Sequence, residues 1–480
     1  MLRRFNVKNF MSFLCNKDGL SDEFSMLPGR VQKMKSHLCD DGDKGLLKFA
    51  AIYGANASGK SNLIKAITCM KEIIANNSSK GYTDKYCRIG EDNKDKPSYF
   101  EVEIFLNKKR YVYGFEIILS QSRFVSEWLV ELLSGNNENV IFERDIENNQ
   151  FTLCEAWETD ETLMNRLDIY LEDVATEKTA LFLHFMNDNK NNFYEKFPQV
   201  SILSDVYDWF FGKLVINKPN QPVGEFNYFS SNQQMENALK IIKTFGTGID
   251  NYKIENIETE DLLNKLPNEL RKEIESAIEK YRIVLSKLNV ELKEKYSDDT
   301  DKSAIDEVLS GVTLTISSKN KKQLFFIIVK NDDVICNVIK FYHSDTNSFD
   351  FGEESDGTQR LWELLEVLLT EEEKIFFIDE IDRCMHPSLT YKFVKNFFEL
   401  SENNNVQLVV TTHESRLLDF DLLRRDEIWF VEKQKNGDSE IYSLEDYNER
   451  FDRKIDKAYL EGRYGGVPVF TSLFPIEEDY

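Results

Sequence analysis

The sequence predicts an α/β fold in which an antiparallel β-meander and a large helical insertion interrupt a core of buried strands and helices. Three observations support this prediction. An apolar run at 49–53 leads into the stretch GANASGKS and then into a helical segment. A second apolar run, at 375–378, ends in two adjacent carboxylates. Between these runs, residues 99–142 alternate apolar and polar side chains, and residues 155–310 are rich in charged side chains at helical spacing.

The composition is that of a globular protein. Of the 480 residues, 41% are hydrophobic, and a chain of this length exceeds one ordinary core, so we expect two or three structural units. No apolar run is long enough to span a membrane, and the N-terminal MLRRFNVKNF lacks the apolar region of a signal peptide. The seven cysteines are scattered without a C-x-x-C pair, which argues against disulfides and a cysteine-based zinc site. We therefore expect a cytoplasmic protein.

The formal net charge of −24 repels nucleic acid at long range, so DNA could bind only through a local basic patch. Two short basic runs exist, Lys108–Arg110 and Lys319–Lys322. Each falls where a hairpin turn is expected, and we interpret both as solvated turns. The charge favours a protein partner over nucleic acid.

The stretch GANASGKS has the spacing G-x-x-x-x-G-K-[ST] of the phosphate-binding loop of P-loop NTPases. Its glycines let successive backbone N–H groups point at an anion, and the following helix directs its N-terminal dipole there. Lys60 adds a positive charge for the β- and γ-phosphates, and the Ser61 hydroxyl is a ligand for Mg²⁺. We therefore predict that ATP and Mg²⁺ bind here. The predicted nucleotide-binding residues are Gly54, Ala55, Asn56, Ala57, Ser58, Gly59, Lys60, Ser61 and Asn62.

The second element is KIFFIDEID, residues 374–382, which has the Walker B pattern. Asp379 ends a buried strand, where it can hold Mg²⁺ through water, and Glu380 is placed to polarise the attacking water. The two predicted metal ligands are thus Ser61 and Asp379. Because they lie far apart in the sequence, a large segment must be inserted between the two halves of the ATPase.

The insertion determines the expected domain boundaries. We predict that residues 1–150 form the N-terminal half of an ATPase head with the β-meander, and that residues 311–480 form the C-terminal half. Residues 151–310 are expected to form a helical insertion or lid. Within it, apolar residues from Leu270 to Leu292 recur every three or four positions, which predicts one long amphipathic helix.

Residues 351–369, FGEESDGTQRLWELLEVLL, contain a turn with Ser355, Gly357 and Gln359 that opens a helix. A small hydroxyl, a glycine and a helix N-terminus together suit an anion. The stretch resembles the signature motif of ABC-type ATPases, with Asp356 in place of the usual first glycine. In that family the Ser and Gly of the motif contact the γ-phosphate held by the opposite subunit.

After Walker B, an apolar run at 406–410 leads into Thr411, Thr412 and His413. The resemblance to ABC-type ATPases implies that His413 is the switch histidine, which contacts the γ-phosphate, and that Asp382 lies in the D-loop. The order P-loop, signature, Walker B, D-loop and switch histidine predicts an ABC-type head that works as a dimer. It makes Glu380 and His413 the catalytic candidates, and adds Ser355, Gly357 and Asp382 to the nucleotide-binding set.

Five stretches are similar to the RloA/OLD-like group of bacterial ABC ATPases: MLRRFNVKNFMSF, YGANASGKSN, FIDEIDRCMHPSL, TTHESRLLD and AYLEGRYGGVP. Members of this group are often encoded beside an effector in restriction or abortive-infection loci. SMC-type proteins insert much longer coiled-coil arms than the roughly three heptads present here. OLD nucleases carry a C-terminal TOPRIM domain, whereas the segment IWFVEKQKNGDSEIYSL is better explained as a hairpin that turns at Asn436-Gly437.

The resemblance implies an ATP-hydrolysing subunit of a bacterial anti-phage system. Two heads would sandwich two ATP molecules, and the opening and closing of this homo-oligomer would control a neighbouring effector such as a nuclease or toxin. A RecF/SMC-like DNA-repair or chromosome-associated ATPase shares every head motif and remains an alternative, as does a nucleotide-locked scaffold with little turnover. The other histidines, His37, His184, His343 and His386, lack ligand spacing and are interpreted as structural or surface residues.

Overall fold

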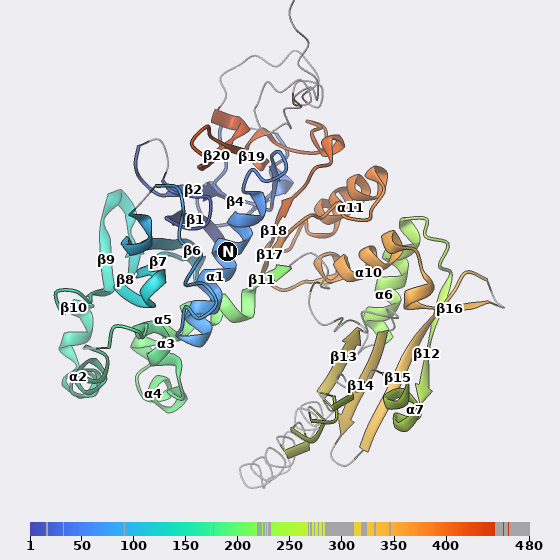
Figure 1. Ribbon diagram of the computed structural model, residues 1–480, viewed down its shortest axis with the longest axis horizontal. Coiled ribbons are helices and arrows are strands. Elements are labelled where there is room, and N and C mark those ends of the chain that lie inside the picture. Colours follow the sequence, from blue (N-terminus) through green and yellow to red (C-terminus); the bar gives the residue numbers. More distant parts are fainter. Residues whose placement is uncertain are drawn as a thin grey trace, which may run out of the picture. The chain divides into compact units, whose positions relative to one another are not determined.

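The computed structural model divides the chain into two compact units (Figure 1). Unit 1 comprises Met1–Pro219, Thr370–Asp382 and Thr390–Tyr480, and unit 2 comprises Asn220–Leu369 and Arg383–Leu389. The structure describes residues 1–446, together with 455 and 459, except positions 16, 17, 32, 91, 176, 218–222, 224, 225, 227, 229–231, 267, 269, 270, 273, 277, 281, 284–311, 318–323, 331, 332, 345 and 346. The C-terminal stretch AYLEGRYGGVP, apart from Tyr459, and the basic run at 319–322 lie outside the described residues.

Unit 1 contains a six-stranded sheet with the order β11-β17-β18-β5-β19-β20. The strands are β11 (Leu214–Asn217), β17 (Lys374–Ile378), β18 (Val406–Thr411), β5 (Phe49–Tyr53), β19 (Ile428–Lys433) and β20 (Ser439–Ser443). All neighbours are parallel except β19 and β20, which form an antiparallel hairpin. Every side chain of β5 is buried, as expected for a strand in the middle of a parallel sheet. The predicted strands at 49–53, 375–378 and 406–410 and the predicted hairpin at Asn436-Gly437 are confirmed.

Two long helices accompany this sheet. Helix α1 (Lys60–Asn76) buries Leu63, Ile67, Met70 and Ile74, which recur at helical spacing and join the same core as side chains of β5 and β6. Helix α11 (Pro387–Leu400) begins with a proline, which suits the first turn of a helix. A two-stranded sheet of β3 (Leu38–Cys39) and β4 (Leu46–Leu47) also belongs to unit 1.

The predicted meander is confirmed as part of a seven-stranded antiparallel sheet with the order β10-β9-β8-β7-β6-β1-β2. Its strands are β1 (Leu2–Lys8), β2 (Asp22–Ser25), β6 (Ser98–Leu106), β7 (Lys109–Ile118), β8 (Arg123–Leu132), β9 (Glu138–Asp145) and β10 (Gln150–Leu153). Asn107 and Lys108 adopt positive φ angles of 51° and 63° at the turn between β6 and β7, as tight hairpins require. The basic run at 108–110 therefore does lie at a hairpin turn.

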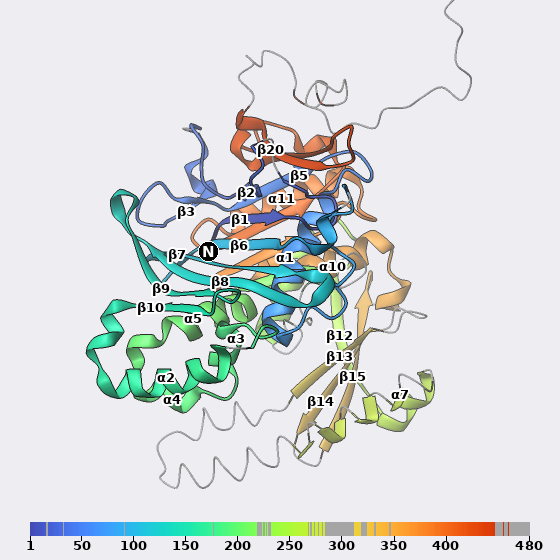
Figure 2. The ribbon, with the colours of Figure 1, turned by 60° about the vertical axis from the view of Figure 1, so that its left-hand side comes forward.

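Four helices follow the meander and lie beside β9 and β10 in unit 1 (Figure 2). They are α2 (Glu161–Ala175), α3 (Phe182–Asn187), α4 (Asn191–Lys196) and α5 (Ile202–Asp208). The buried Glu127 of β8 accepts hydrogen bonds from the backbone N–H groups of Phe182 (2.6 Å) and Leu183 (3.0 Å), which fixes the start of α3 against the sheet. These helices are therefore packed onto the meander.

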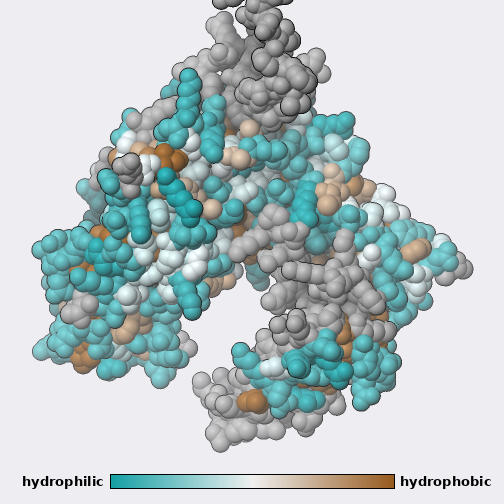
Figure 3. Space-filling model, in the orientation of Figure 1, coloured by the Kyte–Doolittle hydropathy of each residue, from teal (hydrophilic) through white to brown (hydrophobic). Residues whose placement is uncertain are grey.

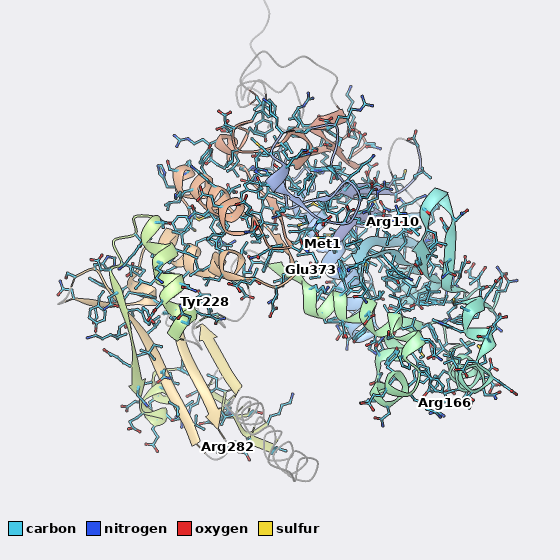
Figure 4. All side chains as sticks on the ribbon, turned by 180° about the vertical axis from the view of Figure 1, so that it is seen from behind. Met1, Arg110, Arg166, Tyr228, Arg282 and Glu373 are labelled. Carbon is cyan, nitrogen blue, oxygen red and sulfur yellow. The ribbon has the colours of Figure 1, made fainter. Side chains whose placement is uncertain are left out.

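Unit 2 has a second antiparallel sheet with the order β12-β15-β14-β13, and β16 pairs with β15. Its strands are β12 (Asn251–Ile257), β13 (Val312–Ser317), β14 (Leu324–Lys330), β15 (Asp333–Tyr342) and β16 (Ser348–Asp350). Its helices include α6 (Asn232–Thr244), α7 (Thr259–Lys265) and α10 (Asp356–Leu369). The hydroxyl of Tyr228, which lies beside α6, donates to the carbonyl oxygen of Trp362 in α10 at 2.6 Å (Figure 4).

The segment 151–310, expected to be a helical insertion, also contains β11 and β12, and the structure divides it between the two units. Strand β11 is only four residues long and pairs with the distant β17, so no local pattern identifies it. Of the predicted long helix, Ile274 and Ile278 pack against Leu262 and Ile327, whereas the part beyond Ile283 lies outside the described residues. None of the described helices combines the length and apolarity needed to cross a membrane, and the visible surface is largely hydrophilic (Figure 3).

Candidate functional site

The stretch GANASGKS forms a loop that curls between β5 and the N-terminus of α1. Ala57 and Gly59 adopt positive φ angles of 63° and 116°, which turn the chain tightly enough to face its backbone inward. A Cβ atom at Gly54 would collide with the carbonyl oxygen of Val431 and lie 2.5 Å from the Ser58 hydroxyl. The close approach of β19 thus requires glycine at position 54.

Lys60, the first residue of α1, turns back into the loop. Its ammonium group donates hydrogen bonds to the carbonyl oxygens of Gly54 (2.8 Å) and Ala55 (3.1 Å). Burial lowers the Lys60 pKa to about 8, although the carboxylates of Asp379, Glu380 and Asp382 act in the opposite direction. An anion held by this loop would stabilise the charged ammonium, so the buried lysine fits a phosphate ligand.

The two predicted metal ligands are brought together. The Ser61 hydroxyl donates to Oδ1 of Asp379 at 3.0 Å, and Asp379 lies at the carboxyl end of β17, where its side chain is buried. Among the described residues, no three His, Cys, Asp or Glu side chains converge closely enough to hold a metal ion. One hydroxyl and one carboxylate suit Mg²⁺, which usually takes few protein ligands and completes its shell with phosphate and water.

Thr411, at the end of β18, connects the two carboxylate residues. Its hydroxyl donates to Oδ1 of Asp379 at 2.6 Å and accepts the backbone N–H of Glu380 at 2.8 Å. Because β18 lies between β5 and β17, its carboxyl end opens directly beside the loop. Glu380 has a positive φ of 52°, an uncommon conformation that often marks functional sites. No local sequence pattern indicates this role for Thr411.

His413 and Asp382 lie on the same side of the sheet. The backbone N–H of His413 is 3.4 Å from both carboxylate oxygens of Asp382. Partial burial and the Lys60 ammonium lower the pKa of the His413 imidazole, while Asp382, Glu380 and Asp379 raise it. With the pKa below its ordinary value, His413 is mainly neutral at pH 7 and can donate a hydrogen bond to an anion.

Two serines support the loop through hydrogen bonds, a role that no sequence motif predicts. Asn62 donates to the hydroxyl of Ser12 at 2.8 Å, and the hydroxyl of Ser439 donates to the carbonyl oxygen of Ser58 at 2.6 Å. A Cβ atom at Gly59 would collide with the Ser439 hydroxyl. Ser12 follows β1 and Ser439 begins β20, so only the folded chain reveals this support.

A cavity of about 460 Å³ adjoins the loop where α1 begins. Its lining includes Ser12, Asn62, Tyr86, Arg88 and Lys433. It therefore offers an aromatic ring and cationic side chains beside the residues that support the loop.

The signature residues belong to unit 2. Ser355 precedes α10, and its hydroxyl accepts the backbone N–H of Thr358 at 3.1 Å, so it caps the helix. A Cβ atom at Gly357 would lie 3.0 Å from the carbonyl oxygen of Cys384. Gln359 is buried and donates to the carbonyl oxygen of Glu354 at 2.6 Å. The structure thus gathers the loop, Asp379, Glu380, Asp382 and His413 in unit 1, while Ser355 and Gly357 form a helix N-terminus in unit 2.

A parallel core with a phosphate loop at one strand end and adjacent carboxylates at another defines a P-loop ATPase of the ABC/AAA type. The family described as "AAA domain, putative AbiEii toxin, Type IV TA system" matches residues 49–156 and 254–419. These residues are more than half of the chain, and the chain belongs to this family. No match was found among curated proteins.

Among solved structures, similarity extends to heads of SMC proteins. The SmcHead bound to the C-winged helix domain of ScpA is 16% identical, with a TM-score of 0.37, over 92% of this chain and 97% of that one. The SMC head domain from Thermotoga maritima is 13% identical, with a TM-score of 0.38, over 92% and 98%. The Smc head domain with an extended coiled coil, bound to the C-terminal domain of ScpA derived from Pyrococcus furiosus, is 14% identical, with a TM-score of 0.35, over 96% and 98%.

Proposed function

We propose that the protein binds ATP with Mg²⁺ and hydrolyses it at the loop of unit 1. The observation that carries this proposal is the contact between Ser61 and Asp379, because it joins the end of the phosphate loop to the carboxylate that ends β17. Bound there, Mg²⁺ would be held by these two side chains and would neutralise charge on the phosphates. Lys60 would bind the β- and γ-phosphates.

Glu380 and His413 would act on the reacting end of the nucleotide. Glu380 is half-exposed, and its backbone is fixed by Thr411, so its carboxylate is available to orient the attacking water and accept its proton. His413 would donate a hydrogen bond from its imidazole to the γ-phosphate. Asp382 faces the His413 backbone and would position this histidine.

We further propose that two copies engage head to head around ATP, with Ser355 and Gly357 of one copy against the γ-phosphate bound by the other. The protein would serve in a bacterial anti-phage system of the RloA/OLD-like kind, where ATP-driven engagement senses a trigger and controls a neighbouring nuclease or toxin. The family description, which names a toxin–antitoxin system, supports a role in defence. If deletion of the neighbouring gene left phage protection intact, the partner would be wrongly assigned.

The ATPase is tested with three single variants and two matched controls. Lys60→Ala should lose tight ATP binding in calorimetry, because it removes the buried cation of the loop. Lys65→Ala, on the exposed face of the same helix, should bind ATP normally.

Glu380→Gln should bind ATP at least as tightly as the wild type and hydrolyse it about 100-fold more slowly, since it loses the base but keeps the shape. Asp379→Asn should weaken the Mg²⁺ dependence of ATP binding.

Glu372→Gln is the control for Glu380→Gln, because the Glu372 side chain is mostly exposed just before β17. It should hydrolyse ATP at the wild-type rate. Wild-type turnover in Glu380→Gln would show that another group is the base. Tight, salt-sensitive DNA binding with DNA-stimulated turnover would instead favour the RecF/SMC-like alternative.

A further inference from the structure

A residue from the C-terminal part of the chain, Tyr459, lies against the start of the phosphate loop. Its ring stacks on Phe430 of β19, at a centroid distance of 5.8 Å and a tilt of 27°, and meets the ring of Tyr53 edge-on at 5.5 Å. Tyr53 is the last residue of β5, directly before Gly54. Only 5% of Tyr459 is exposed, and Ile455, four positions earlier and also helical, is buried as well. Packing therefore fixes the Tyr459 ring beside the loop.

The phenol of Tyr459 also contacts the loop. Its oxygen accepts a hydrogen bond from the backbone N–H of Gly54. Burial raises the pKa of Tyr459, and this N–H opposes the rise, so the phenol is neutral at pH 7. The carbonyl oxygen of Gly54 in turn accepts a hydrogen bond from the Lys60 ammonium at 2.8 Å. Gly54 is thus held on one side by Tyr459 and on the other by the cation proposed to bind the phosphates.

The same group of rings joins the loop to the segment that carries His413. Tyr53 pairs with Phe430 in the parallel sheet, and its hydroxyl donates to the carbonyl oxygen of Glu414 at 3.2 Å. Glu414 directly follows His413. Because Tyr459 packs on both Tyr53 and Phe430, it lies where the start of the loop and the histidine segment are connected.

ATP should change how strongly Gly54 depends on Tyr459. In the proposed ATP complex, the Lys60 ammonium turns to the β- and γ-phosphates, which weakens its bond to the Gly54 carbonyl oxygen. The Gly54 N–H then depends more on the phenol, since Gly54 is buried and a buried N–H that loses its acceptor is costly. The contact with Tyr459 should therefore contribute more when ATP is bound.

We propose that Tyr459 is a positioning residue of the ATP site, which holds Gly54 in the conformation that binds the phosphates. It would act through Gly54 and not on the reacting atoms. Docking of Tyr459 and binding of ATP would then favour each other to the same extent, because the coupling between two sites is reciprocal. This inference rests on the proposed function, since it requires ATP in the loop.

The first test is Tyr459→Phe, which keeps the ring and removes the phenol oxygen. The Kd and the KM for ATP should rise about three- to tenfold, because the Gly54 N–H loses its acceptor, while kcat stays within about twofold of the wild type. With ATP bound, the Gly54 amide should exchange its hydrogen faster than in the wild type. Mass spectrometry of a peptide that covers residues 50–58 measures this exchange.

Tyr442→Phe is the matched control. The Tyr442 ring also packs on Phe430, at 5.8 Å, but its hydroxyl donates to Glu432 at 3.2 Å and not to the loop. This variant should bind and hydrolyse ATP as the wild type does. Tyr459→Ala, which removes the ring as well, should weaken ATP binding at least as much as Tyr459→Phe.

A second measurement needs no variant. In the wild type, ATP should slow hydrogen exchange in a peptide that covers Ile455 and Tyr459, as reciprocal coupling requires. Unchanged exchange in this peptide at saturating ATP would overturn the inference. So would wild-type ATP affinity and Gly54 exchange in Tyr459→Phe, even if Tyr459→Ala lowered the Tm, because Tyr459 would then act by packing alone. Both results leave the proposed function intact, whereas a wild type that bound no ATP would overturn the function and the inference together.

Discussion

The Thr411 hydroxyl holds both carboxylate residues of the site in position. It donates to Asp379 and accepts the backbone N–H of Glu380, and the second of these bonds fixes a residue whose φ is positive. The carboxylates of Asp379 and Glu380 both act on the Lys60 ammonium of the phosphate loop, whose positive charge is opposite to theirs. The chemistry proposed for Glu380 therefore depends on a neighbour that makes no contact with the reacting atoms.

Thr411→Val should test this dependence. Valine keeps the shape but leaves the Glu380 N–H without its acceptor, which costs about 1–3 kcal/mol. Steady-state hydrolysis should fall by roughly 10–100-fold, as for other residues that orient a metal ligand, and the KM for Mg²⁺ should rise. Thr390→Val is the matched control, because the buried Thr390 hydroxyl of α11 has no hydrogen-bond partner. Equal losses in both variants would show that Thr411 acts through packing alone.

At the scale of elements, glycine is required where a side chain of a neighbouring strand lies too close for a Cβ atom. In the middle of β7, Gly114 lies under the ring of Trp128 of β8. That ring lies beside the ring of Tyr99, at a centroid distance of 5.3 Å and a tilt of 34°. The indole N–H of Trp128 donates to Glu101 at 3.0 Å. Because Gly114 has no side chain, the rings of Trp128 and Tyr99 have room on this face of the sheet.

Gly114→Ala should destabilise the seven-stranded sheet. The added Cβ would collide with the Trp128 ring and lie 2.8 Å from the carbonyl oxygen of Phe100. We expect a loss of about 1–3 kcal/mol, as in other overpacked sites, seen as a lower Tm. Gly212→Ala is the control, because a Cβ there meets nothing within 4 Å. An unchanged Tm in Gly114→Ala would mean that the Trp128 ring moves aside freely.

Helix α11 is joined to the rest of unit 1 through a buried histidine. The His37 ring stacks on Phe398 of α11, and its Nδ1 is 2.9 Å from a carboxylate oxygen of Glu427. Burial, Arg424 and Lys48 lower the His37 pKa to about 4, while Asp426 opposes them. The folded protein thus keeps this imidazole neutral.

Lowering the pH should reduce the stability that the buried His37 contributes. Unfolded chains bind a proton at the histidine near pH 6.5, whereas the folded protein does so only near pH 4, so stability should fall as the pH drops through this window. The loss is on the order of a few kcal/mol. Burial raises the pKa of Glu427, which acts in the opposite direction, so the Tm is compared between the wild type and His37→Asn. Between pH 6.5 and pH 4 the Tm of His37→Asn should fall by less than the Tm of the wild type. If the two Tm values fell equally over this range, the protonation of His37 would not be the cause of the loss.

At the scale of the whole molecule, the two units divide the proposed ATP contacts. The phosphate loop and the carboxylates belong to unit 1, and the Ser355 turn belongs to unit 2. Ser355 caps α10 through its hydroxyl, so the helix N-terminus is formed within each copy. In the proposed dimer, it would meet the nucleotide of the other copy.

Glu380→Gln should therefore accumulate as a dimer with ATP, visible as an ATP-dependent mass shift in mass photometry. Adding Ser355→Arg should block the shift, since a bulky side chain would stand where the opposite γ-phosphate must lie. Ser355→Asn keeps a side chain that can cap α10 and should dimerise more than Ser355→Arg. If Glu380→Gln remained monomeric with saturating ATP, engagement of two heads would not be its mode of action.

The sequence by itself determined the elements that depend only on residues close together in the chain. GANASGKS specifies its loop through a few backbone conformations, the alternation at 99–142 specifies antiparallel strands, and the acids after 375–378 mark a strand end. The tertiary structure alone decided that β18 separates β5 from β17, that Thr411 and Ser439 support the site, and that β11 extends the sheet. It also decided that Asn220–Leu369 and Arg383–Leu389 form one compact unit and the rest of the chain the other. The reason is physical: strand pairing and packing join residues far apart in the chain, and no local pattern records which of them will meet.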